Sequence, residues 1–337
     1  MQVMTAHRDS GWHIVGHDWA VKVLQRAVVA DDVSHAYLFT GPPGVGKTTL
    51  AHSLAAALLC EREDVAARPC GDCRSCRLVA GGNHPDVHMV ASEHVGANLK
   101  IDQVRDLVHR LTMTPVEGRR QVAILNRFEE ATPSAANALL KTLEEPPSYV
   151  VLIVLAREAD LLLPTIVSRC QQISLRPLPV RIVERALVER WDAEREQAEL
   201  LAHLSSGRLG WAVRKLKDDK ALARRATRLD DLRDLLRASV VERFDYAEEL
   251  ARDPVATQET LDLWIGWWRD VLLVASAARA PLTNVDRREV LQDHARRLDV
   301  AKISAVIKSL RSSLQKLQRN ANRRLTLEVL MLDLPRF

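Results

Sequence analysis

Aromatic residues are scarce in this sequence, and no long run of apolar residues occurs. Phe, Trp and Tyr make up 4% of the 337 residues, which argues against the stacked aromatic platforms that bind single-stranded nucleic acid. The longest apolar run, Val150 to Ala156, is far shorter than the ~20 residues that cross a bilayer. The N-terminus has no basic stretch followed by an apolar core. We therefore expect a cytoplasmic protein without a membrane partner.

Neither sign of charge is in large excess. The 48 basic and 44 acidic residues give a net charge of +4, which is too mild to indicate nucleic-acid binding by itself. Basic pairs occur at Arg224-Arg225, Arg287-Arg288 and Arg323-Arg324. Such pairs usually belong to solvated helix faces, and DNA contact is the alternative. The length suffices for two or three domains.

The sequence does contain an unbroken nucleotide-binding loop with the spacing G-x-x-x-x-G-K-T. It lies between an expected strand, Ala36 to Thr40, and an expected helix, Thr48 to Leu59. In such a loop the backbone N–H groups and the helix N-terminus hold phosphates, the lysine reaches the terminal phosphates and the threonine hydroxyl binds magnesium. A chance Gly/Pro turn is the alternative. The expected nucleotide-binding residues here are Gly41, Pro42, Pro43, Gly44, Val45, Gly46, Lys47, Thr48 and Thr49.

The carboxylates that hydrolysis normally requires are missing from their usual place. A second buried strand ends in an Asp that helps to hold magnesium, often followed by a Glu that orients water. The expected strand Gln121 to Leu125 is followed instead by Asn126 and Arg127. An amide supplies no negative charge, and a cation beside magnesium opposes it. Glu129 is an alternative as a displaced carboxylate, but we favour a solvated charge at a helix start. The loop therefore predicts binding of ATP or ADP with Mg²⁺ and poor hydrolysis.

Four of the five cysteines lie close together. Cys70, Cys73 and Cys76 are each separated by two residues, and Cys60 lies upstream. Four thiolates at such spacing bind a tetrahedral Zn²⁺ and leave no position open for water, so we expect a structural zinc site. Disulfides are disfavoured in a cytoplasmic protein, and the spacing is not that of a typical ferredoxin cluster. The isolated Cys170 is expected to be a small buried apolar residue.

The pattern of elements changes along the chain. Strand and helix patterns alternate up to about residue 176, which predicts a parallel sheet with helices on both faces. Further strands are expected at Val87 to Val90 and Val150 to Leu155. A proline-containing linker at 176–179 precedes three expected helices, which are Val180 to Arg190, Arg195 to Leu204 and Leu209 to Leu216.

From about residue 221 the pattern is entirely helical. One helix face is expected to be a packing surface, and it carries Leu261, Trp264, Ile265, Trp268, Val271 and Leu272. Later helices are expected at Ala301 to Arg319 and Leu325 to Leu334. The sequence therefore predicts an α/β domain followed by helical domains.

One segment carries a resemblance to a known family. Ala136 to Pro147 has the sequence A-N-A-L-L-K-T-L-E-E-P-P, and Ser168-Arg169-Cys170 lies downstream. Together they closely resemble the clamp-loader ATPases of the bacterial replicative polymerase. The resemblance covers most of residues 12 to 216 and is weaker over the C-terminal helices. Other matching stretches are Ile14-Val15-Gly16, His35 to Phe39, the four-cysteine module, His84-Pro85-Asp86 and Asn322 to Glu328.

This resemblance implies an AAA+ module, a three-helix lid and an all-α collar through which five subunits form an open ring. The domains would then be an AAA+ domain at 1–176 with the zinc module inserted at about 60–76, a lid at 177–220 and a collar at 221–337. Val15 would join the nucleotide-binding residues. The implied partners are the motor (gamma/tau) and delta subunits, the sliding clamp and primer-template DNA, in a replisome associated with the nucleoid.

The resemblance also implies a catalytic role in trans for Arg169. In this family each motor site is completed by the arginine of a Ser-Arg-Cys motif from the neighbouring subunit. Arg169 would be that arginine finger, and such a cation increases phosphoryl transfer by roughly 10³ to 10⁵ in related chemistry. Without the resemblance, a salt-bridged loop arginine is the simpler interpretation.

Three departures from the motor pattern indicate which kind of subunit this is. Asn126-Arg127 replaces the Asp-Glu pair, Ala156 stands where motors carry a polar sensor, and Gly210 stands at the position of the lid arginine, with Arg208 displaced. These losses resemble the family's rigid stator, which does not hydrolyse ATP. An ATP-hydrolysing motor subunit or another AAA+ ATPase is the alternative, and a zinc-dependent DNA-binding module is a third possibility.

Overall fold

The computed structural model describes residues 11–94, 96–319 and 321–337, and these pack into two compact units. The first unit holds the residues up to Ile182 together with Arg208–Trp211, and the second holds Val183–Gly207 and Ala212–Phe337. The described residues include no helix that is long and apolar enough to span a membrane.

The first unit is built on a five-stranded parallel sheet with the order β2-β3-β4-β1-β5. The strands are β1 (Ala36–Thr40), β2 (Val87–Val90), β3 (Gln121–Leu125), β4 (Val150–Ala156) and β5 (Gln171–Ser174). The three central strands are buried along their whole length, because helices cover both faces of a parallel sheet. The carboxyl ends of β3, β4 and β1 therefore lie side by side, with β4 in the middle.

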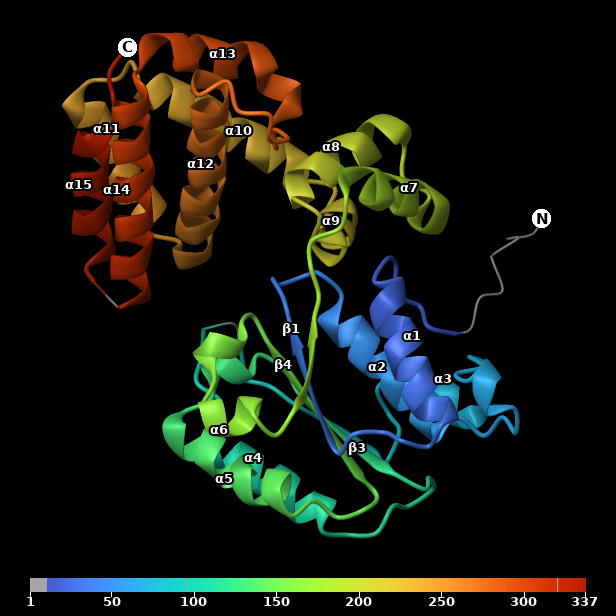
Figure 1. The fold of residues 1–337 in the computed structure, drawn as a ribbon. Coiled ribbons are helices and arrows are strands. Elements are labelled where there is room, and N and C mark those ends of the chain that lie inside the picture. Colours follow the sequence, from blue (N-terminus) through green and yellow to red (C-terminus); the bar gives the residue numbers. More distant parts are fainter. Residues whose placement is uncertain (1–10, 95, 320) are drawn as a thin grey trace. The chain divides into compact units, whose positions relative to one another are not determined.

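Helices cover the two faces of this sheet as predicted (Figure 1). One face carries α1 (Asp18–Val29), α2 (Lys47–Leu59) and α3 (Arg74–Ala80), and the other carries α4 (Ile101–Leu111), α5 (Pro133–Glu144) and the short α6 (Pro164–Val167). Side chains of a strand point alternately to the two faces. Tyr37 and Phe39 accordingly belong to one buried cluster and Leu38 to the other.

Helix α5 is the segment that carries most of the family resemblance. Thr132 caps its N-terminus by accepting a hydrogen bond from the N–H of Ala135 (3.2 Å), and Pro133 occupies the first turn. The helix ends at Glu144, just before Pro146 and Pro147, as prolines require. Leu139 and Leu143 are buried against the sheet.

Among the described residues of the second unit, all regular elements are helical, which confirms the predicted class of the C-terminal part. Its helices are α8 (Arg195–Ser205), α10 (Ala221–Leu235), α11 (Val240–Ala251), α12 (Pro254–Ala275), α13 (Arg288–Arg297), α14 (Val300–Gln318) and α15 (Arg323–Asp333), with most of α7 (Val180–Trp191) and α9 (Leu209–Leu216). Figure 1 shows α12, α14 and α15 running alongside one another. Short 3-10 turns connect other elements, including η2 (Phe128–Glu130) after β3.

The core of the second unit lies around α12. Leu261, Trp264, Trp268 and Val271 are buried there as predicted, whereas Ile265 and Leu272 are only partly buried. The prediction missed Trp267, which is also buried and donates a hydrogen bond to His294 (3.2 Å).

Residues 183–207, from the predicted lid, pack with the C-terminal helices in this unit. One link is a hydrogen bond between Nδ1 of His203 and the carbonyl of Leu282 (3.0 Å). The finer division into domains at 1–176, 177–220 and 221–337 stays a prediction.

Candidate functional site

The nucleotide loop connects β1 to α2 at the carboxyl edge of the sheet. Gly41, Gly44 and Gly46 have φ values of 140°, 83° and 118°, a region that favours glycine. A Cβ on Gly41 would lie 2.4 Å from the carbonyl oxygen of Leu175. The N–H of Gly41 donates to the carbonyl of Arg157 (2.9 Å) at the end of β4. The loop is therefore tied to the neighbouring strand at its first residue.

Lys47 lies inside the curve of this loop. Its ammonium donates hydrogen bonds to the carbonyls of Gly41 and Pro42, the latter at 3.2 Å. Burial lowers the pKa of Lys47 to about 8, while attraction to Glu129 opposes this shift and Arg157 adds to it. Lys47 is thus held where the loop is expected to receive phosphates, with one carboxylate and one further cation nearby.

The remaining predicted nucleotide contacts differ in exposure. Val45 is buried, Thr48, Val15, Pro42, Gly44 and Gly46 are half-buried, and Pro43 and Thr49 are exposed. Thr48 and Thr49 lie in the first turn of α2. The loop, strand and helix stand in the predicted order.

Two residues of the N-terminal segment contact the loop and were not predicted as site residues. Nε2 of His17 lies 3.2 Å from the carbonyl of Val45, and burial lowers the pKa of this histidine. The side chain of Ile14 packs against Gly46, since its Cδ1 would lie 3.3 Å from a Cβ at that position. Only the motif Ile14-Val15-Gly16 pointed to this segment in the sequence.

The end of β3 holds Asn126 and Arg127 as expected, but Arg127 is directed toward β2. Its Nε donates to Glu130 (2.8 Å) and its Nη2 donates to the carbonyl and hydroxyl of Ser92 (2.8 and 2.7 Å). Ser92 follows β2, which lies on the opposite side of β3 from β4 and β1. The charge of Arg127 is therefore satisfied on the side away from the loop.

Our expectation of a solvated Glu129 is wrong. Its side chain is only 10% exposed and forms an ion pair with Nε of Arg157 at 3.3 Å. The second carboxylate oxygen, Oε2, is buried and has no hydrogen-bond partner among the described residues. Sequence reasoning also missed Arg157, which follows β4 and whose carbonyl binds the loop.

The other two departures from the motor pattern are located in the first unit. Ala156 is buried at the end of β4, paired with Thr40 of β1. The N–H of Gly210 donates to the carbonyl of Gly44 in the nucleotide loop (2.8 Å), and a Cβ at Gly210 would lie 3.0 Å from that oxygen. Arg208 lies over the ring of Trp211, 5.7 Å from its centroid.

Arg169 lies outside this loop, after α6. It donates from Nη1 to the carbonyl of Thr165 (2.9 Å) and from Nη2 to Glu144 (2.8 Å), and its side chain is 35% exposed. A partner could therefore reach it. The neighbouring Cys170 is half-buried, and burial raises the pKa of its thiol to about 11.

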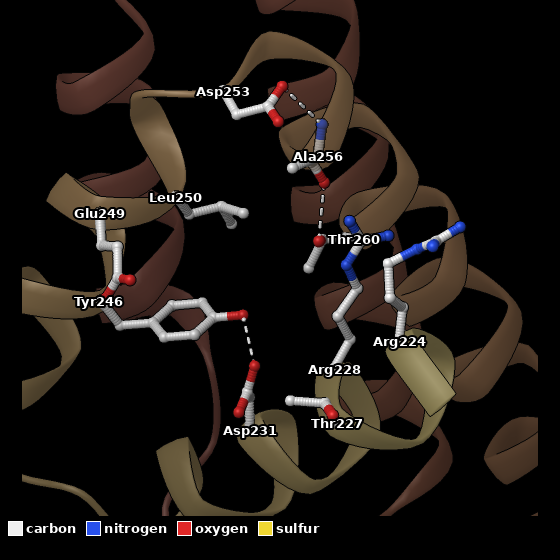
Figure 2. Close-up of a pocket in the computed structure, with 10 residues that line it drawn as sticks. All are labelled: Arg224, Thr227, Arg228, Asp231, Tyr246, Glu249, Leu250, Asp253, Ala256 and Thr260. Carbon is white, nitrogen blue, oxygen red and sulfur yellow. Dashed lines mark hydrogen bonds between the residues drawn. The ribbon is translucent and has the colours of Figure 1, made fainter. Parts of the chain in front are cut away.

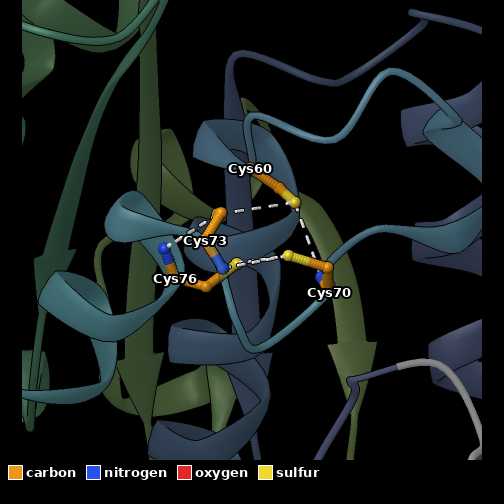
Figure 3. Close-up of side chains that lie close together, drawn as sticks. All are labelled: Cys60, Cys70, Cys73 and Cys76. Carbon is orange, nitrogen blue, oxygen red and sulfur yellow. Dashed lines mark hydrogen bonds between the residues drawn. The ribbon is translucent and has the colours of Figure 1, made fainter.

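The four cysteines meet as predicted, at the junction of α2 and α3 (Figure 3). Their sulfur atoms all lie within 4.8 Å of one another, with 4.0 Å between Cys70 and Cys76 and 3.9 Å between Cys60 and Cys73. Four thiolates around one zinc ion at ~2.3 Å lie roughly 3.8 Å apart. Disulfide sulfurs would be about 2.05 Å apart. The donor set therefore fits a metal ion.

Backbone N–H groups and burial act in opposite directions on these sulfurs, and burial raises the pKa of the Cys60 and Cys76 thiols. The N–H groups of Cys70, Cys73 and Cys76 donate to the sulfurs of Cys60, Cys70 and Cys73 at 3.3 to 3.4 Å. Burial opposes ionisation of Cys70, but hydrogen bonds from the N–H groups of Cys73 and Asp72 outweigh it and lower its pKa to about 7. N–H donors of this kind stabilise a thiolate, which is the form that binds metal.

Most arginines of the basic pairs in the second unit are engaged with partners, whereas Arg288 is exposed. Arg225 pairs with Asp286, Arg287 with Asp230, Arg224 with Asp218 and Arg324 with Glu248 and Glu328, while Arg323 donates to the carbonyl of Ala251. These contacts favour the interpretation as ion-paired helix surfaces over a DNA-binding patch.

The second unit also contains a cavity of about 330 Å³, shown in Figure 2. The Tyr246 hydroxyl donates to Asp231 across it (3.2 Å), Asp253 caps α12, and Arg228 pairs with Glu259 (2.9 Å). Most of its polar groups thus have partners within the protein, and we assign no ligand to it.

The fold and the loop define an α/β module with a P-loop motif, followed along the chain by a helical domain. Two family profiles match: the one described as DNA polymerase III, delta subunit, at residues 16–179, and the one described as DNA polymerase III, delta subunit, C terminal, at residues 220–335.

Curated relatives agree with these profiles. The chain is 35% identical to the DNA polymerase III subunit delta' of Pseudomonas aeruginosa over 317 residues, covering 89% of this chain and 91% of that protein. It is 29% identical to the subunit delta' of Bacillus subtilis, covering 93% and 94%. The tau subunit of Escherichia coli is 34% identical, but over 58% of this chain and 31% of tau. The chain belongs to the delta' family of DNA polymerase III clamp-loader subunits.

Proposed function

We propose that this chain is a stator subunit of the replicative clamp loader, which does not hydrolyse ATP itself and lends Arg169 to a neighbouring motor site. The main observation behind this proposal is that the nucleotide loop is intact, while Asn126, Ala156 and Gly210 stand at the positions of the motor's catalytic groups. The relatives named delta' support it, since they match along nearly the whole chain. The tau relatives of Bacillus subtilis and Escherichia coli match over 55% and 58% of this chain.

The partners follow from this role. We propose a hetero-pentameric ring with motor (gamma/tau) and delta subunits, which places the sliding clamp on primer-template DNA in the cytoplasmic, nucleoid-associated replisome. Arg169 supports this proposal because it is partly exposed and held by a single carboxylate, Glu144, and by the carbonyl of Thr165. A finger held in this way is able to exchange partners when a nucleotide phosphate approaches.

We further propose that the loop binds ATP or ADP without turning it over. Backbone amides and Lys47 hold phosphates without requiring the carboxylates of the second strand. When bound, Mg²⁺ would meet the Thr48 hydroxyl.

We propose that Cys60, Cys70, Cys73 and Cys76 hold a structural Zn²⁺. The set is complete with four sulfurs, so no position stays open for a catalytic water. The site connects the end of α2 to the N-terminal segment, because Trp12 donates to the carbonyl of Arg68 (3.1 Å) within the same loop. The metal would therefore fix this corner of the first unit.

The stator role is tested by reconstituting the loader with this chain carrying Lys47→Ala. The variant loader is expected to hydrolyse ATP and load clamps like the wild-type loader, because turnover takes place in the motor subunits. The purified chain with primed DNA is expected to release no phosphate. Lys47-dependent turnover by the purified chain would contradict the stator role and favour a motor subunit.

A further inference from the structure

Glu129 connects the end of β3 to the nucleotide loop. It lies in η2, which follows β3 after Asn126 and Arg127, and it pairs with Arg157, the first residue after β4. The carbonyl of Arg157 in turn accepts the N–H of Gly41, the first residue of the loop. In P-loop proteins the nucleotide site lies at the carboxyl ends of two strands, which correspond here to β1 and β3. Strand β4 lies between them in the sheet, so the ion pair of Glu129 with Arg157 connects the end of β3 to the end of β4, beside β1.

The carboxylate of Glu129 is buried with one oxygen unused. Oε1 forms the ion pair with Nε of Arg157, whereas Oε2 is buried without a hydrogen-bond partner among the described residues. A buried polar atom without a partner costs free energy, so a native structure that keeps one needs a reason for it. Lys47 lies near enough to feel the charge of Glu129, which acts against the effect of burial on the pKa of the lysine.

The neighbouring Glu130 differs in this respect. Its Oε2 accepts hydrogen bonds from Arg127 and from the hydroxyl of Ser92, and its Oε1 accepts the N–H of Gly96 (2.9 Å). Both oxygens of Glu130 are thus occupied on the β2 side of the sheet. Of the two adjacent glutamates, Glu129 is the one with a free oxygen and the one on the side of the loop.

We propose that Glu129 replaces the missing strand-end carboxylates and makes nucleotide binding at this loop dependent on Mg²⁺. The inference rests on the proposal that residues Gly41 to Thr48 bind ATP or ADP. Metal-free phosphates are repelled by the buried carboxylate, whereas Mg²⁺ neutralises them and is a hard cation that prefers carboxylate oxygens, directly or through water. Arg157 offsets part of the negative charge of Glu129. Glu129 therefore supports binding of Mg²⁺ with the nucleotide, but it does not replace both acidic residues of the motor's Asp-Glu pair.

The experiment is calorimetric titration of the full-length chain with ADP and with ATP, each in MgCl₂ and in EDTA. The measured quantity is the ratio of the dissociation constant of each nucleotide in EDTA to its dissociation constant in Mg²⁺. Glu129→Gln is expected to lower this ratio about tenfold or more, which is the usual loss when a group supporting a bound metal is removed. Glu158→Gln is the matched control, because Glu158 is an exposed glutamate next to Arg157, and it is expected to keep the wild-type ratio.

A second variant tests the charge of Glu129 by removing its ion-pair partner. Arg157→Gln removes the cation that pairs with Glu129 and is expected to raise the ratio above the wild-type value. This variant keeps the proposal testable if Glu129→Gln does not fold. Wild-type ratios in folded Glu129→Gln or in Arg157→Gln would overturn the role of Glu129 and leave nucleotide binding intact. Absence of binding in all conditions would overturn the nucleotide proposal together with this inference.

Discussion

The buried carboxylate of Asp86 is expected to hold the connection between α4 and β3 in place. The residue is fully buried directly before β2, where its Oδ1 accepts the N–H of Val116 (2.6 Å). Its Oδ2 accepts the N–H groups of Glu117 (2.9 Å) and Gly118 (2.7 Å). The substitution Asp86→Asn keeps the shape but leaves only one oxygen, and its NH₂ group then faces an N–H donor.

The magnitude follows from these three bonds. A hydrogen bond to a charged group contributes about 1.5 to 3 kcal/mol, and Asn is expected to lose one of them and weaken the other two. We predict a loss of about 2 to 4 kcal/mol in the free energy of unfolding at pH 7. The exposed Asp106 on α4 provides the control, because Asp106→Asn makes the same change of charge on the surface.

The effect depends on pH with a defined sign. Burial opposes ionisation of Asp86, but the N–H groups of Val116, Gly118 and Glu117 outweigh it and hold its pKa below the usual range. The stabilisation is therefore complete above the unfolded-state pKa of about 3.9 and is lost as the pH falls through the lower folded-state value. The difference between wild type and Asp86→Asn should shrink at acidic pH.

Urea unfolding followed by circular dichroism measures the global effect, and hydrogen exchange of residues 113–120 measures local opening. In Asp86→Asn the free energy of unfolding is expected to fall and the exchange of this segment to become faster. In Asp106→Asn both quantities are expected to stay near the wild-type values. An Asp86→Asn chain within about 0.5 kcal/mol of wild type at pH 7, with unchanged exchange of this segment, would refute the reasoning.

Further predictions concern the metal site and the C-terminal helices. Cys73→Ser is expected to lose the bound zinc, as measured by elemental analysis, and to have a lower Tm than wild type. A metal-free variant with the wild-type Tm would contradict a structural zinc. Arg243→Met should cost about 3 kcal/mol or more in urea unfolding, because this buried guanidinium donates to the carbonyls of Leu235, Met331, Leu334 and Pro335. The control is Arg237→Met at an exposed site, and equal stability of the two variants would refute this role.

The features that sequence predicts well are those determined by short spacing. The nucleotide loop between a strand and a helix, the three central strands and the cysteine cluster all depend on residues within one turn or one connection. Gly46 and Lys47, for example, take their places through local backbone geometry at the start of α2. Such patterns indicate the chemistry of a site before its surroundings are known.

The environment of Glu129 could not be predicted in this way. Its burial depends on the strand order, which brings the end of β4 between β3 and β1, and on Arg157, which is 28 residues away in sequence. The direction of Arg127 toward Ser92 likewise depends on the position of β2. No local pattern encodes these neighbours, so a helix-start glutamate was the simplest expectation.

Edge and packing details were missed for a related reason. Strand β5 (Gln171–Ser174) exposes three of its four residues and has no apolar run, so only its pairing with β1 defines it. Trp267 is buried because α13 supplies His294 as a partner on a side of α12 that the periodic pattern did not include.

The claim that this chain lends an arginine to its neighbour is tested most directly by ATP hydrolysis of the assembled clamp loader carrying Arg169→Ala. Arg185→Ala is the control, since Arg185 is an exposed arginine on α7. The account predicts that Arg169→Ala assembles normally and sharply reduces DNA-stimulated turnover, up to the roughly 10³-fold or greater effect of an arginine finger if a single motor site governs the rate, while Arg185→Ala keeps wild-type turnover. An assembled Arg169→Ala loader that hydrolyses ATP and loads clamps at the wild-type rate would contradict it.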